Sequence, residues 1–394
     1  MSFLPNFFVP EYVLNAIDTI ERAGYCVYMV GGCVRDLLLN RTPKDYDLCS
    51  NAPCEDIMQI FEKTIPTGIK HGTVTVIINH NAIEITRMRT DGDYSDFRRP
   101  DSVAFTDDIT ADLSRRDFTI NAMAMNSAYD ILDPFEGQAD LKHGIIRCAG
   151  DPKLRFSEDA LRILRALRFA ARLNFHIEPA TIEAAVDLCA NLQSIAPERI
   201  FSEIREILAS NKPEVLDPVI MAGGLEFLHI VRRSVKRLGR LDSDLAVRIA
   251  ALCHLCGTNP NILCTRLRTN NHLKTQANSL YEHTQIPLPR SLYAFKAVFF
   301  DMDKALWMKS LEIRKEMFDE YDNMLYNEVK GAVFENHPVT ISELNIGGDD
   351  LIALGIHGRD ISRVLQILLS YIHRFPEQNN KTVLTEYARE IITE

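Results

Sequence analysis

The sequence predicts an α+β protein whose N-terminal part mixes helices and strands and whose remainder is helical. Two observations favour this fold class. Short β-prone runs bounded by glycine and turn residues lie within the first 147 residues. From residue 157 onward, apolar residues recur at helical spacing, as Leu161, Leu164 and Leu167 do in "EDALRILRALRFAARL". We therefore expect a mixed sheet near the N-terminus and no sheet beyond residue 150.

The N-terminal elements are expected to follow one another at short intervals, separated by glycines and polar turns. In order, they are a helix over 11–23, a strand over 26–30, a helix over 34–39, a strand over 45–48, a helix near Pro53 that Ser50 or Asn51 caps, and two strands joined by a polar turn in "TVTVIINHNAIEITRMR".

The stretch "YMVGGCVRDLLLNRTPKDYDLCSN", residues 28–51, combines a Gly-Gly turn with two nearby carboxylates. Glycines lack a Cβ, so backbone N–H groups at such a turn, close to the start of a helix, can approach phosphate oxygens. Asp45 and Asp47 alternate along a predicted strand and therefore project to the same face. Paired carboxylates suit Mg²⁺, which substrate phosphates help to hold. The stretch predicts a site for a nucleoside triphosphate and its metal.

That combination resembles the nucleotidyltransferase superfamily that includes DNA polymerase β. Within it, the stretch is similar to the class II tRNA nucleotidyltransferase and bacterial poly(A) polymerase family. Four later stretches resemble further motifs of this family: RRDF-x-x-NA in 112–126, DP-x-x-G-x-x-DL in 132–147, ED-x-x-R-x-x-R-x-x-R in 156–173 and ER-x-x-x-E in 197–208.

The resemblance implies a nucleotidyltransferase head with a mixed sheet, followed by an all-helical neck, body and tail. The expected bounds are 1–147 for the head, 148–208 for a neck with the base-reading helix, 209–304 for an RNA-binding body and 305–394 for a tRNA-binding tail.

The resemblance also implies the site residues. Asp45 and Asp47 would be catalytic and metal-binding, and the nucleotide would be bound by Gly32, Arg35, Arg116, Asp159, Arg162, Arg165 and Arg168. Asp159 and Arg162 would read the base as neighbours on one helix face. Their carboxylate and guanidinium match the exocyclic amine and ring acceptor that cytosine and adenine share. On an ideal helix Arg168 points about 180° away from Asp159, so its contact is the least expected.

Three other residues have open interpretations. Asp117 is expected to contact the ribose. Asn121 either serves the same site or is a helix-cap or core amide. Glu84, on the second strand of the hairpin, is either a third carboxylate for the metal or part of a structural salt bridge.

The implied reaction adds C, C and A to the 3′ end of tRNA from CTP and ATP, requires Mg²⁺ and releases pyrophosphate. The polar loop over 91–108 resembles one that the family associates with the final A, which disfavours an enzyme adding only C. An enzyme adding only the terminal A remains open. A poly(A) polymerase is disfavoured by "TGIKHGTVTV" (67–76), and an inactive tRNA-binding module is disfavoured by the intact motif residues.

The composition limits the partners and the compartment. The net charge is -10, so RNA would have to meet local basic surfaces, for which 141–172 and 231–240 are the candidates. Nine cysteines and an N-terminus without a signal-peptide pattern predict reduced thiols and a cytoplasmic protein. No apolar run approaches the ~18 residues of a membrane span. The sequence does not indicate the oligomeric state.

Overall fold

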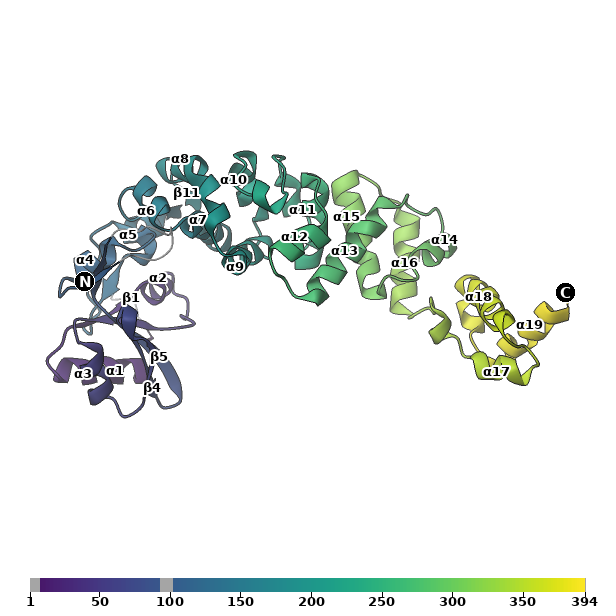
Figure 1. Cartoon of the computed structure of the whole chain (residues 1–394), viewed down its shortest axis with the longest axis horizontal. Helices are drawn as coiled ribbons and strands as arrows, with labels where there is room; N and C mark the ends of the chain where they lie inside the picture. Colours follow the sequence, from purple (N-terminus) through teal and green to yellow (C-terminus); the bar gives the residue numbers. More distant parts are fainter. Residues whose placement is uncertain (1–7, 93–101, 394) are drawn as a thin grey trace. The chain divides into compact units, whose positions relative to one another are not determined.

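The computed structural model describes residues 8–92 and 102–393, and the chain divides into two compact units (Figure 1). The first unit comprises Met1–Ser234 and Arg266–Arg268, and the second comprises Val235–Thr265 and Thr269–Glu394. The expected head, neck, body and tail divide the chain more finely, and their boundaries stay predictions.

The first unit contains the predicted mixed sheet. Its strands are β1 Val27–Val30, β2 Asp47–Ser50, β3 Thr64–Gly68, β4 Thr73–Ile78, β5 Asn81–Arg87, β8 Ala124–Met125 and β9 Ile131–Leu132. Their order is β3-β4-β5-β2-β1-β8-β9. Strands β2 and β5 are parallel, and the other neighbours are antiparallel. The hairpin β4–β5 is the one that the sequence predicted.

Helices cover this sheet and continue into the rest of the first unit. They are α1 Glu11–Arg22, α2 Gly32–Leu38, α3 Cys54–Ile60, α4 Ile109–Ser114, α5 Gly137–His143, α6 Pro152–Glu158, α7 Leu161–Leu173, α8 Pro179–Leu188, α9 Pro197–Leu208 and α10 Asp217–Met221. Figure 1 shows α1 and α3 beside the sheet, where Ile17 and Ile57 share a core with Leu48 of β2. The residues on either side of Leu48 point to the opposite face, where Cys49 packs with Leu113 of α4.

Two expectations about the early elements were wrong in detail. Strand β2 begins at Asp47, so Asp45 precedes the strand. Helix α3 has Pro53 at its N-cap position and no side-chain cap. The side chain of Asn51 instead accepts a hydrogen bond from the backbone N–H of Cys26 at 2.9 Å.

Two small sheets were not predicted. Strand β10 (Ile145–Ile146) pairs in parallel with β11 (His176–Ile177), so one strand does form beyond residue 150 and pairs with a strand just before it. Two-residue strands give too short a pattern to be recognised in a sequence. Strands β6 (Arg89–Asp91) and β7 (Val103–Phe105) pair antiparallel within the segment expected to be a polar loop. The residues between these strands, 93–101, lie outside those that the structure describes.

The DP-x-x-G segment fixes the start of α5. The Asp133 carboxylate accepts hydrogen bonds from the backbone N–H groups of Gly137 at 2.7 Å and Gln138 at 2.8 Å. Gly137 has no room for a side chain, because a Cβ there would lie 2.2 Å from the carbonyl oxygen of Thr119. The motif therefore packs α5 against residues 119–121, which belong to the RRDF-x-x-NA segment.

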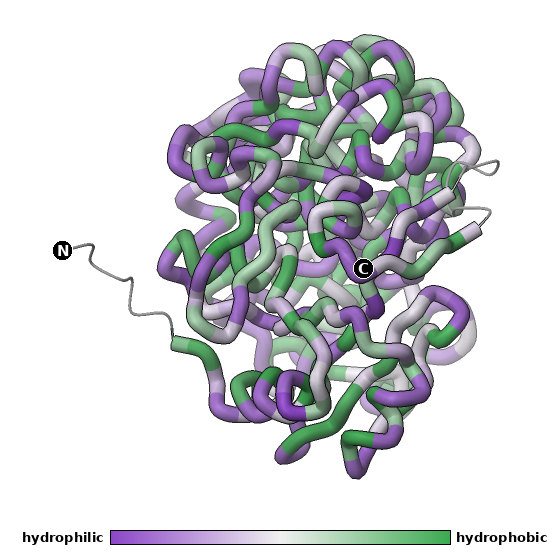
Figure 2. Tube along the Cα trace, turned by 90° about the vertical axis from the view of Figure 1, so that its left-hand side faces the viewer, coloured by the Kyte–Doolittle hydropathy of each residue, from purple (hydrophilic) through white to green (hydrophobic). Residues whose placement is uncertain are grey.

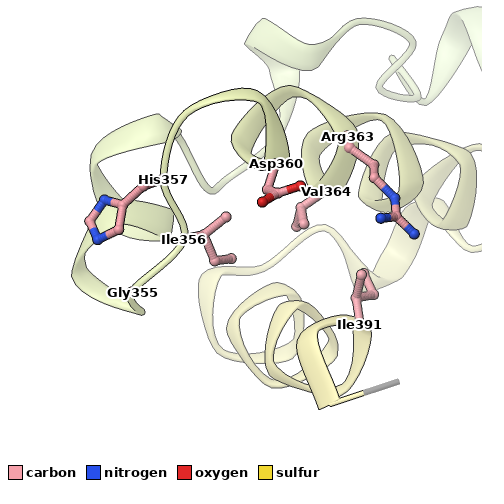
Figure 3. Close-up of a pocket in the computed structure, with 7 residues that line it drawn as sticks. All are labelled: Gly355, Ile356, His357, Asp360, Arg363, Val364 and Ile391. Atoms are coloured by element: carbon pink, nitrogen blue, oxygen red, sulfur yellow. The ribbon is translucent and has the colours of Figure 1, made fainter.

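The second unit is helical throughout its described residues, as predicted. Apart from Arg266 at the end of α12, it contains α11 Leu245–Cys256, α12 Pro260–Arg266, α13 Asn271–Gln285, α14 Leu292–Val298, α15 Lys304–Phe318, α16 Asn323–Phe334, α17 Gly348–Ala353, α18 Arg359–Arg374 and α19 Lys381–Thr393. The last three share a core that includes Leu351, Leu368 and Leu384. A cavity of about 310 Å³ lies beside the turn between α17 and α18. Its lining includes His357, Arg363 and Ile391 (Figure 3).

A buried lysine joins several helices of the second unit. The Lys296 side chain is fully buried, and its ammonium contacts His337 Nδ1 at 2.9 Å and donates to the carbonyl oxygen of His373 at 3.2 Å. Burial lowers the pKa of Lys296 to about 8. The folded protein therefore holds this proton less tightly than the unfolded chain does.

No helix in the described part of the chain is long and apolar enough to cross a membrane. In Figure 2, hydrophobic and hydrophilic residues are interspersed along the segments of the trace that face the viewer.

Gly137→Ala should destabilise the protein by about 1–3 kcal/mol, because the backbone of residue 119 would have to move to admit the new methyl group. The measurement is the free energy of unfolding in urea. Gly331→Ala is the matched control, since a Cβ at Gly331 meets nothing within 4 Å. Equal unfolding curves for Gly137→Ala and the wild type would contradict the packing described for α5.

Raising the pH from 7 to 9.5 should stabilise the wild type relative to Lys296→Met by about 2 kcal/mol. As the pH rises through about 8, the folded lysine loses its proton while the unfolded lysine, with its ordinary pKa of 10.5, keeps it. Stability therefore rises with pH. Urea unfolding at both pH values gives the difference, and the exposed Lys330→Met is the control. Parallel pH profiles for wild type and Lys296→Met would refute the lowered pKa.

Candidate active site

A cleft of about 690 Å³ in the first unit brings the predicted site residues together. All nine residues that the sequence analysis assigned to the site line it, although they come from α2, the start of β2, the RRDF segment and α6–α7. The lining also includes Asn121, Phe169 and Arg199, which were not among the nine. Placement in one cleft is a geometric result, and the role of each residue stays a prediction.

The carboxylates of Asp45 and Asp47 face the cleft from either side of Tyr46, whose side chain is buried. Asp47 lies in register with Glu84 of the parallel neighbour β5. Burial raises the pKa of Asp47, and the charges of Glu84 and Asp45 raise it further, while Arg116 lowers it. Such crowded negative charge is relieved by a bound cation.

Asp45 and Asp47 provide two candidate metal ligands, which is fewer than a complete coordination shell needs. Among residues 8–92 and 102–393, no group of three His, Cys, Asp or Glu side chains is placed to hold a metal ion. Glu84 is in register with Asp47 on the neighbouring strand, and its role as a third carboxylate stays a prediction. Mg²⁺ is usually held by one or two carboxylates, while substrate phosphates and water occupy its other coordination positions.

Gly31, more than Gly32, is the glycine that the turn requires. Gly31 has φ of +75° and stands at the N-cap position of α2. A Cβ there would lie 3.0 Å from Arg116 Nη1, whereas one at Gly32 would make an ordinary contact. The turn thus lets Arg116 approach the backbone. The sequence pattern alone could not show which glycine of the pair has the left-handed conformation.

The RRDF segment is anchored by Asp112, a fully buried carboxylate. It binds Arg115 at 2.6 Å and Arg116 at 3.1 Å. Burial favours the neutral acid, but the two guanidinium groups outweigh it and hold the pKa of Asp112 below its ordinary value. Asp112 therefore remains an anion that fixes Arg116 at the edge of the cleft.

Asp117 positions Arg165. One carboxylate oxygen accepts from Arg165 Nε at 2.8 Å and Nη2 at 2.5 Å, and the other accepts from Asn121 Nδ2 at 3.2 Å. Burial alone would raise the pKa of Asp117, but Arg165 lowers it to about 2. Asn121 also accepts from Arg35 Nη1 at 2.7 Å. Asn121, which lines the cleft, therefore connects Arg35 of α2 through Asp117 to Arg165 of α7, in agreement with the interpretation that it serves this site. The expected ribose contact of Asp117 stays a prediction.

The expectation that Asp159 and Arg162 share one helix face was wrong. Helix α6 ends at Glu158, Asp159 is extended with φ −140° and ψ 104°, and α7 begins at Leu161. The Asp159 carboxylate accepts from the backbone N–H of Leu161 at 3.0 Å, a local bond that competes with helix continuation.

The two base-reading candidates therefore have different partners. Arg162 binds Glu158 at 2.6 Å and donates to the carbonyl oxygen of Arg115 at 3.0 Å. Asp159 binds Arg199 of α9 at 2.8 Å. Both still line the cleft.

Arg168 faces the cleft after all. The argument that placed it opposite Asp159 assumed a continuous helix, and Asp159 is not in α7. Arg168 binds Glu203 of α9 at 2.5 Å. Arg199 and Glu203, which hold Asp159 and Arg168, were missed as site residues. Their spacing in the ER-x-x-x-E stretch was the available signal.

The lining of the cleft has a strong excess of positive charge. Eight arginines and four aspartates line it, in a chain whose net charge is -10. Arginine donates several hydrogen bonds in a planar fork that matches phosphate oxygens. The cleft is thus suited to a polyphosphate with a metal ion at one side.

Comparison with known proteins agrees with this geometry. A family model described as the poly A polymerase head domain matches residues 27–147, and one described as a probable RNA and SrmB-binding site of polymerase A matches 174–216. A CCA-adding enzyme of Streptococcus thermophilus is 32% identical over 380 residues, which cover 93% of each chain. One of Leuconostoc citreum is 48% identical over 208 residues, or 53% of this chain and 51% of the relative.

Solved structures extend the likeness over the whole chain. The Bacillus stearothermophilus CCA-adding enzyme in complex with CTP has a TM-score of 0.75 and 28% identity, covering 98% of both chains. The Thermotoga maritima CCA-adding enzyme complexed with tRNA, at 20% identity and a TM-score of 0.63, supports the fold alone. From these similarities, the chain belongs to the family of class II bacterial CCA-adding enzymes and adds CCA to the 3′ end of tRNA.

Proposed function

We propose that the cleft transfers nucleotidyl groups from CTP and ATP to the 3′-hydroxyl of tRNA and releases pyrophosphate. The observation that supports this most strongly is the single cleft that joins an aspartate pair, a set of arginines and two base-reading candidates. The 3′-hydroxyl attacks the α-phosphate in line, while the arginines bind the triphosphate oxygens.

Asp45 and Asp47 are the proposed ligands of Mg²⁺. Families with this head domain generally use a divalent metal, and an oxygen donor set fits magnesium. Bound there, Mg²⁺ would supply a Lewis acid for the α-phosphate and the attacking hydroxyl. The two carboxylates themselves hold negative charge beside Arg116, which orients the phosphates next to them.

Asp159 and Arg162 are proposed to read the base. The carboxylate accepts from the exocyclic amine of cytosine or adenine, and the guanidinium donates to the adjacent ring nitrogen. Guanine and uracil present the opposite groups, so they would leave both charges without hydrogen bonds in a partly enclosed site. Arg199 and Glu158 hold the two side chains before the base arrives.

The helical parts are proposed to bind tRNA by local basic surfaces, in a cytoplasmic protein. In the first unit, the second family match over 174–216 carries RNA binding in its description. In the second unit, the turn between α17 and α18, with Arg363 and His357 beside its cavity (Figure 3), is the proposed tail contact. Such contacts would be made to the phosphate backbone and be sensitive to salt.

One assay separates this function from its alternatives. The protein is incubated with tRNA lacking CCA, with CC-ended tRNA and with oligo(A), each with CTP, ATP or both. Addition of C, C and A to the first substrate supports the proposal. Addition of A alone to CC-ended tRNA would indicate an A-adding enzyme, and extension of oligo(A) would indicate a poly(A) polymerase.

Asp45→Ala or Asp47→Ala should lower the rate of C addition by more than about 10³-fold, because a metal-bridging carboxylate acts on the transition state. Binding of tRNA should stay near the wild-type level, since other parts of the chain hold it. Asp18→Ala, at an exposed position of α1, is the control. Substantial activity of either variant in Mg²⁺ would show that the metal assignment is wrong.

Substituting Asp159 with Ala or Arg162 with Ala should relax base choice as well as slow addition, because each supplies one half of the base-specific pattern. The readout is incorporation of UTP and GTP relative to CTP and ATP, with Arg205→Ala on the exposed part of α9 as control. A variant that is slow but still fully selective for C and A would mean that the residue only positions the triphosphate.

A further inference from the structure

The aromatic ring of Phe169 lies at the centre of the arginine cluster in the cleft. Phe169 belongs to α7, lines the cleft and is 6% exposed. The guanidinium carbons of Arg168, Arg35 and Arg165 lie 4.4, 5.3 and 5.5 Å from the centre of its ring. Two of these arginines come from α7 and one from α2, so the ring also connects two helices of the first unit.

Three guanidinium groups around one ring repel one another, and their positions need an explanation. Each has a carboxylate partner: Arg35 binds Asp36, Arg165 binds Asp117 and Arg168 binds Glu203. The three partners come from different parts of the first unit, namely α2, the RRDF segment and α9. An aromatic face attracts a cation within about 6 Å of its centre. The ring therefore supplies the common attraction that keeps all three groups at the cleft.

The ring itself is held by the RRDF segment. Phe118, which is fully buried, meets Phe169 edge to face, with the ring centres 5.7 Å apart and the planes at 77°. Its neighbour Asp117 binds Arg165, one helical turn before Phe169 on α7. Two consecutive residues of the segment thus fix an arginine and an aromatic ring on the same side of α7.

We propose that Phe169 is a positioning residue for the triphosphate: its ring orders Arg35, Arg165 and Arg168 so that their free N–H groups face the phosphates. The ring makes no hydrogen bond to the nucleotide and acts through the three arginines. This inference rests on the proposed nucleotide-binding role of those arginines and extends it to a residue that the sequence analysis did not single out.

The main test is Phe169→Leu in the full-length protein, which keeps an apolar side chain and removes the ring. The dissociation constant and the KM for CTP should rise about 5–30-fold, the range of one to two cation–π contacts, with a smaller change in kcat. Binding of CMP, which lacks the two outer phosphates, should change by less than about twofold. Phe169→Tyr, which keeps an aromatic ring, should bind CTP nearly as the wild type does.

Two controls make the outcomes distinct. Phe156→Leu truncates another fully buried phenylalanine of the first unit and should leave CTP binding unchanged.

Arg168→Ala tests whether the arginines bind the nucleotide, which is the assignment on which the positioning role depends. If Arg168→Ala weakens CTP binding while Phe169→Leu does not, the positioning role is refuted and the arginine assignment stands. If neither affects CTP binding, both fail. If Phe169→Leu weakens CTP and CMP equally and lowers stability as Phe156→Leu does, the ring is only a core residue and the proposal is overturned.

Discussion

Arginine–carboxylate pairing holds the cleft in shape. Each of the five arginines predicted to bind the nucleotide has a carboxylate of the first unit within ion-pair distance, namely Asp36, Asp112, Glu158, Asp117 and Glu203 for Arg35, Arg116, Arg162, Arg165 and Arg168. A guanidinium has five N–H donors, and one carboxylate uses at most two or three of them. Further N–H groups of Arg35 and Arg162 bind the side chain of Asn121 and backbone carbonyl oxygens, so these guanidinium groups are held in fixed directions beside the cleft. The cleft can therefore concentrate positive charge without leaving any of these five arginines uncompensated.

The pairing also explains how the sheet-containing part and α7 act as one site. Arg162 donates to the backbone of Arg115, Arg165 binds Asp117, and Phe169 packs on Phe118. These contacts follow one face of α7 and the consecutive residues of the RRDF segment. The segment is in turn fixed by Asp112, and the next residue, Leu113, packs with Cys49 of β2, the strand that begins at Asp47. These contacts connect the strand of Asp47 to the arginines of α7.

Much of this could be predicted from the sequence, because motifs with fixed local spacing encode it. The Gly-Gly turn, Asp45, Asp47 and the arginines of α7 all line one cleft. The sequence could not show contacts between distant residues, such as Glu203 with Arg168, because nothing in the spacing links positions 35 residues apart. It also failed where a local hydrogen bond overrides periodicity, as at Asp159, whose side chain binds the start of α7 and interrupts an apparently continuous helical pattern.

That interruption bears on how a protein can select bases without a template. On a continuous helix, Asp159 and Arg162 would lie side by side and neutralise each other. Because the helix is interrupted, Asp159 forms its ion pair with Arg199 and Arg162 forms its ion pair with Glu158. Asp159 and Arg162 therefore do not pair with each other, and both line the cleft. In the proposed site, cytosine or adenine can hydrogen-bond to the Asp159 carboxylate and the Arg162 guanidinium at once. These bonds would add to the ion pairs that already orient the two side chains. A base with the reverse pattern would place a donor against a guanidinium and an acceptor against a carboxylate, and unsatisfied charged groups of this kind cost more than neutral ones. If Asp159 and Arg162 read the base as proposed, discrimination would arise from groups that their own partners, Arg199 and Glu158, fix in advance.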